Sequence, residues 1–66
     1  MGKNNFHILV VEDDRHLNTL LTTHIKNLGY QVYSAYDGIQ AITLIREKKL
    51  DLMLIDYKLP DTDAER

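Results

Sequence analysis

Carboxylates gather in two segments that lie far apart in this 66-residue sequence. Glu12, Asp13 and Asp14 directly follow the run FHILVV, and Asp56 directly follows the apolar run LMLI. Carboxylates that are brought together repel one another, which raises the pKa of at least one of them unless a cation neutralises the site. Ligands that offer only oxygen favour a hard cation, Mg²⁺ before zinc or copper.

A magnesium site of this kind suits phosphoryl chemistry. Mg²⁺ in proteins usually keeps several waters and takes one or two carboxylates together with phosphate oxygens of a substrate. A carboxylate beside the ion can attack phosphorus and form an acyl phosphate, and the protein then contributes positioning and charge neutralisation. This chemistry requires that the two acidic segments meet in the folded chain.

Hydrophobic periodicity predicts five elements joined by short links. Nearly continuous apolar runs are typical of strands buried on both faces of a parallel sheet, and apolar residues at helical spacing lie between them. The predicted order is a strand over 6–11, a helix with Leu17, Leu20, Leu21, Ile25 and Leu28, a strand over 30–35, a helix with Ile39, Ile42 and Ile45 and with Ala41 and Leu44 alongside them, and a strand over 50–55.

Local signals mark where the two helices begin and end. Asp13 or Asp14 can cap the first turn of the first helix, and Gly29 suits the position just past its end. Asp37-Gly38 is also a strong hairpin signal. The isoleucine spacing that follows it favours a helix over a returning strand, so we predict a helix there.

Alternating strands and helices predict a single α/β domain over residues 1–66, with parallel strands and right-handed crossovers. The functional groups of such sheets gather at the carboxyl ends of the strands. The first predicted strand ends at the acidic segment 12–14, and the third ends at Asp56. We therefore expect the two acidic segments to meet at one edge of the sheet.

Composition argues against several classes of protein and site. The sequence has no cysteine, so disulfides and thiolate metal sites are excluded, as suits a reducing cytoplasm. A net charge of −2 does not favour binding to nucleic acid. The apolar runs are too short to span a membrane, and we expect no secretory signal. The three histidines show no paired ligand spacing, and we expect His24 to pack rather than to catalyse.

Three motifs, in order, resemble the first half of the response regulator receiver domains of two-component signalling. ILVVEDD precedes the first predicted helix, GYQVYSAYDGIQAI follows it, and DLMLIDYKLPD comes last, so the resemblance covers essentially the whole sequence. The resemblance implies the β-α-β-α-β half of a flavodoxin-like, doubly wound parallel sheet with strand order 2-1-3.

The resemblance also implies roles for individual residues. Asp56 matches the aspartate that accepts a phosphoryl group from a sensor histidine kinase. Asp13 would bind Mg²⁺ directly, and Asp56 would be a further ligand of the ion, whereas Glu12 would bind it through water. Lys58 would offer its backbone carbonyl, not its ammonium group, to the same ion. The resemblance thus implies a bacterial phospho-acceptor domain and not an enzyme.

The sequence departs from the family beyond the acceptor loop. Receiver domains continue through two more strands, which bring a Ser or Thr and a Lys to the phosphoryl group, so we expect a truncated receiver. An unpaired apolar edge would then invite pairing with a second copy or with another receiver. This edge comprises Leu52, Met53, Leu54 and Ile55. The alternative function is therefore self-association or partner binding without phosphotransfer.

Overall fold

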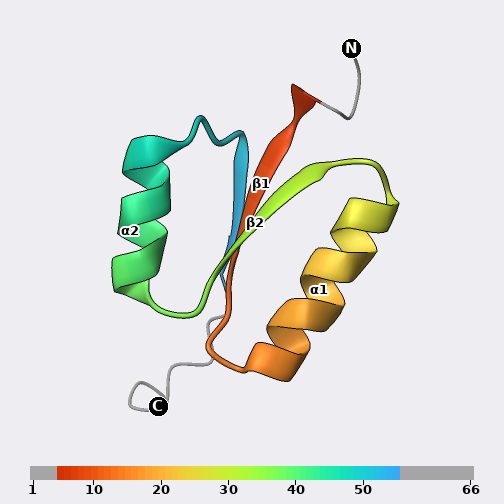
Figure 1. Ribbon diagram of the computed structural model, residues 1–66, viewed down its shortest axis with the longest axis horizontal. Helices are drawn as coiled ribbons and strands as arrows, with labels where there is room; N and C mark the ends of the chain where they lie inside the picture. The colour runs from red at the N-terminus through yellow and green to blue at the C-terminus, as the bar shows by residue number, and fades with distance from the viewer. Residues whose placement is uncertain (1–4, 56–66) are drawn as a thin grey trace, which may run out of the picture.

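The computed structural model describes residues 5–55, which form three strands and two helices (Figure 1). The order of the elements is the predicted one, and each strand begins one or two residues later than predicted. The elements are β1 (His7–Val11), α1 (Arg15–Asn27), β2 (Gln31–Ala35), α2 (Gly38–Glu47) and β3 (Leu52–Ile55). Neither of these helices has the length and apolar character needed to cross a membrane.

The three strands form one parallel sheet in the order β2-β1-β3. This order confirms the predicted α/β fold and the half of a flavodoxin-like sheet. β1 lies in the centre, where Ile8, Leu9 and Val10 are buried. A central strand of a parallel sheet is covered on both faces, which explains why its apolar residues run continuously and do not alternate with polar ones.

The two helices lie on opposite faces of the sheet (Figure 1). Because side chains alternate along a strand, β1 contributes to both layers. Ile8 and Val10 pack with Ile25 of α1, whereas Leu9 packs with Ala41 of α2. Both apolar clusters are small, so the core is thin, as expected for a chain of this size.

The capping residues predicted for α1 are confirmed, and α2 begins at a cap that was not predicted. Asp14 caps α1, because its carboxylate accepts a hydrogen bond from the Leu17 N–H at 3.1 Å. Gly29, just past α1, has a φ of 103°, a backbone conformation that favours glycine. Asp37 caps α2 and accepts from the Gln40 N–H at 2.8 Å, so this segment begins a helix and not a hairpin.

The predicted apolar stripe of α1 faces the sheet only in part. Ile25 is buried and Leu21 packs beside it. Three of the leucines are instead exposed: Leu17, Leu20 and Leu28. His24 is exposed as well, so the expectation that it packs was wrong.

The helix predicted from the isoleucine spacing is confirmed as α2, and its buried face is formed by the neighbouring Ala41 and Leu44. Ala41 is 6% exposed, and Leu44 packs with it against the sheet. The three isoleucines are exposed: Ile39 to 78%, Ile42 to 54% and Ile45 to 44%. Successive helical residues differ by about 100° in direction, so Ile39 and Ile42 point well away from the direction of Ala41. Ile45 follows Ala41 by four residues and lies beside the buried face, where it lines a hollow next to β3.

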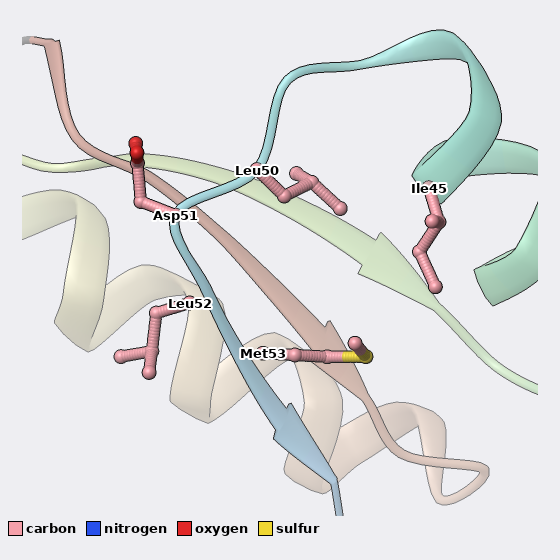
Figure 2. A pocket seen from close by; sticks show the side chains of 5 residues that line it. All are labelled: Ile45, Leu50, Asp51, Leu52 and Met53. Carbon is pink, nitrogen blue, oxygen red and sulfur yellow. The ribbon is translucent and has the colours of Figure 1, made fainter.

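β3 lies at one edge of the described sheet, and all four of its residues are exposed. Its start is held to β1 by two hydrogen bonds. The Asp51 N–H donates to the His7 carbonyl at 2.8 Å, and the Asp51 carboxylate accepts from the His7 N–H at 2.7 Å. Figure 2 shows a hollow between α2 and β3, where Met53 points toward Ile45 while Leu52 points to the opposite face.

Candidate functional site at the carboxyl edge of the sheet

The carboxyl ends of the three described strands meet at one edge of the sheet. Val11, the last residue of β1, is in register with Ala35 at the end of β2 and with Ile55 at the end of β3. The acidic segment 12–14 follows Val11 directly, so it starts at this edge. The predicted position of the first acidic segment is thereby confirmed.

The second acidic segment begins where the description of the structure stops. Asp56 is the next residue in the sequence after Ile55, and both Asp56 and Lys58 lie outside the described residues. Their predicted roles, and the meeting of the two acidic segments, therefore stay predictions.

Glu12 is held inside the loop that follows β1. Its side chain is 3% exposed, and its Oε2 accepts a hydrogen bond from the Asp14 N–H at 2.9 Å. Its own N–H donates to the Ala35 carbonyl at 3.0 Å. A buried carboxylate is costly unless it is hydrogen-bonded, so this carboxylate and the loop conformation depend on each other. Held in this way, Glu12 is less available as a direct metal ligand than an exposed carboxylate.

The carboxylates of Asp13 and Asp14 differ in their hydrogen bonding. Asp14 is exposed and caps α1 through its hydrogen bond with the Leu17 N–H, so its capping role is confirmed. Asp13 is also exposed, and no described hydrogen bond or ion pair engages its carboxylate. Asp13 is thus the carboxylate of this loop that is best placed to bind a ligand from solution.

Asn18 belongs to this edge of the sheet, although sequence reasoning missed it. It is 1% exposed, and its Nδ2 donates to the carbonyls of Glu12 and Ala35 at 3.1 Å each. A signal was available, because Asn18 precedes Leu21 and Ile25 at helical spacing on the face that packs against the sheet. A polar residue at such a position usually has a specific partner.

Arg15 adds a positive charge near the acidic loop and was also missed. It begins α1, two residues after Asp13. Its guanidinium carbon lies 4.2 Å from the centre of the Tyr36 ring, a cation–π contact. Tyr36 directly follows β2, so the contact places the guanidinium at the carboxyl edge of the sheet.

The described donors fit Mg²⁺ in their chemistry. Glu12 and Asp13 offer only carboxylate oxygens, and Mg²⁺ typically binds one or two carboxylates and retains waters. Within residues 5–55, no group of three or more His, Cys, Asp or Glu side chains could hold a metal ion. A magnesium site at this edge would therefore use these two carboxylates together with donors from water or from the residues beyond Ile55.

Comparison with known proteins agrees with this geometry. The family model described as the response regulator receiver domain matches residues 8–64. Regulatory protein VanRc of Enterococcus gallinarum is 41% identical over 57 residues, which cover 86% of this chain and 25% of VanRc. The chain thus spans about a quarter of the length of this curated relative. No solved structure matches the chain significantly. The chain belongs to the response regulator receiver domains, and hence to two-component signalling.

Proposed function

We propose that this chain accepts a phosphoryl group on Asp56 from a sensor histidine kinase, with Mg²⁺ bound beside it. Receiver domains generally bind Mg²⁺ at the phosphorylation site and interact with histidine kinases. The observation that carries the proposal is the register of the strand ends. Val11 pairs with Ile55, and the residue that follows each of them in the sequence is a carboxylate, Glu12 or Asp56.

In the proposed reaction, a carboxylate oxygen of Asp56 attacks the phosphorus of a phosphohistidine. A P–O bond forms, the P–N bond breaks, and the imidazole leaves with the electron pair and takes up a proton. Mg²⁺, when bound, neutralises charge on the phosphoryl oxygens. Asp13 would hold the ion directly, together with Asp56 itself. Glu12 would hold it through water and Lys58 through its backbone carbonyl. The product is an acyl phosphate on Asp56, so the chain acts as a phospho-acceptor and not as an enzyme.

Asp56→Asn tests this function directly. The full chain is incubated with acetyl phosphate and Mg²⁺, and its mass is measured before and after. We expect the wild type to gain the mass of one phosphoryl group and Asp56→Asn to gain none, because an amide is not a comparable nucleophile. Glu47→Gln is the matched control, since Glu47 is exposed at the end of α2, and it keeps the gain. No gain in the wild type, or an equal gain in Asp56→Asn, refutes the proposal.

Self-association through β3 is a second candidate function, and exposure favours it. The side chains of β3 are all apolar, and each is between 39% and 54% exposed. β3 pairs with β1 along one edge, and no described strand covers its other edge. Exposed apolar edge strands are templates for pairing with another chain. The partner would be a second copy of this chain or another receiver.

Light scattering at several protein concentrations distinguishes the two candidates. Association that persists with a chelator and in Asp56→Asn supports a binding module that works without phosphotransfer. A monomer at every concentration argues against it.

For both functions we propose a bacterial cytoplasmic location and partners that are proteins, not nucleic acids, as the absence of cysteine and the net charge of −2 suggest.

A further inference from the structure

Asn18 is a buried polar residue on the face of α1 that packs against the sheet. It is 1% exposed and shares this face with Leu21 and Ile25, which lie in an apolar cluster. A buried amide on such a face costs free energy unless it forms hydrogen bonds. An apolar side chain there would add to the thin core, so packing does not explain the presence of asparagine.

The hydrogen bonds of Asn18 run to the ends of two strands. Its Nδ2 donates to the carbonyl oxygens of Glu12 and Ala35, each at 3.1 Å. The Glu12 N–H also donates to the Ala35 carbonyl, at 3.0 Å. One side-chain amide therefore joins α1, the end of β2 and the loop that follows β1.

The Glu12 carbonyl belongs to the peptide unit that leads into Asp13. A peptide unit is planar, so the plane that contains this oxygen also contains the nitrogen and Cα of Asp13. A hydrogen bond that fixes this oxygen therefore restricts the position of the Asp13 Cα, to which the Asp13 side chain is attached. The Asp13 carboxylate is exposed, and among the described residues no hydrogen bond or ion pair orients it directly.

We propose that Asn18 is a positioning residue for Asp13: its amide orders the Glu12–Asp13 peptide unit before a cation binds. The inference rests on the proposed function in that it takes Asp13 as a Mg²⁺ ligand. A loop that is already ordered loses less conformational entropy when the ion arrives. Loss of a residue that orients a metal ligand typically weakens metal binding by about 10-fold to 100-fold.

Asn18→Leu is the main test variant, because it keeps a branched side chain of similar size and removes both donors. Ile25→Val is the matched control. It also alters a buried side chain on the sheet-facing side of α1, but it lies in the last turns of the helix, away from the acidic loop. Asn18→Ser, which keeps one hydroxyl donor, replaces Asn18→Leu in both measurements if the leucine variant does not fold.

The first measurement is made on the full chain without metal, by ¹⁵N relaxation of the backbone amides. We expect the order parameter of the Asp13 N–H to fall in Asn18→Leu from about 0.85, typical of a rigid backbone, toward about 0.6. We expect Ile25→Val to leave it unchanged. An unchanged value in Asn18→Leu overturns the inference, whatever the chain does with Mg²⁺.

The second measurement is a titration with Mg²⁺ alone, followed by amide chemical shifts. We expect the Kd for Mg²⁺ to rise about 10-fold or more in Asn18→Leu and to stay at the wild-type value in Ile25→Val. An equal Kd in wild type and Asn18→Leu shows a purely structural role and overturns the inference. If the wild type itself binds no Mg²⁺, the proposed function fails, while the order parameters still decide whether Asn18 holds the loop.

Discussion

Leu54→Lys tests whether β3 is an association surface. Leu54 is in register with the buried Val10 of β1, and it is itself 40% exposed. A lysine at this position places a charge on an otherwise apolar edge strand, a substitution that natural proteins use to prevent edge-to-edge pairing. The wild-type side chain would instead be covered when two copies pair.

The expected magnitude follows from the exposed fraction. Complete burial of a leucine side chain contributes about 1.5–3 kcal/mol, and 40% of this side chain remains to be buried. Association therefore gains about 1 kcal/mol from Leu54 in each copy. A two-fold dimer uses the same residue from both copies. The substitution should thus cost about 2 kcal/mol, which corresponds to a roughly 30-fold rise in the Kd of the dimer.

Sedimentation velocity over a range of protein concentrations measures this Kd. Ile39→Lys is the control, because Ile39 is 78% exposed on α2 and the same change of charge there leaves β3 untouched. We expect dissociation of the dimer in Leu54→Lys alone. Equal Kd values for Leu54→Lys and the wild type, or equal weakening by Ile39→Lys, would show that association does not use the β3 edge.

Three further substitutions test the packing and backbone assignments by urea unfolding. Gly29→Ala should lower the free energy of unfolding by about 1 kcal/mol, because φ is 103° there; Gly38→Ala, with open space around the added Cβ, should not. Leu9→Ala should lower it by about 2–5 kcal/mol, because Leu9 is 0% exposed, whereas Ile42→Ala, at a residue 54% exposed, should cost less. Asp37→Ala should cost about 1 kcal/mol and reduce the helical circular dichroism, since it removes the N-cap of α2. Equal losses within either pair, or no loss in Asp37→Ala, would contradict these assignments.

The order of the elements was predictable from local signals in the sequence, whereas the strand order 2-1-3 was implied by the resemblance to receiver domains. The continuous run that contains Ile8, Leu9 and Val10 is typical of a strand covered on both faces, and it forms the central strand. Asp14 and Asp37 offer short side chains that cap a helix within three residues. Such signals act within one turn or one strand and need no knowledge of the tertiary contacts.

The buried faces of the helices were not predictable in the same way. The isoleucines of α2 and the leucines of α1 satisfy helical periodicity, yet the structure buries Ala41 and Asn18. The choice depends on how closely the helix backbone approaches the sheet and on which strand carbonyls need a donor. Both are tertiary properties. A hydrophobicity pattern predicts that isoleucine is buried more readily than alanine. It does not predict that the Asn18 amide is buried because it donates hydrogen bonds at the ends of two strands.

The boundary of β1 explains why two adjacent acidic side chains have different environments. The Glu12 N–H donates to the Ala35 carbonyl at 3.0 Å, so Glu12 continues the pairing of β1 by one residue. Side chains alternate along the strand, which assigns Glu12 to the same face as Ile8 and Val10, and its side chain is buried. Asp13 is the first residue of the loop with an exposed side chain. A shift of the pairing by one residue would exchange these environments, so the identity of the solvent-facing carboxylate depends on the register of β1 with β2.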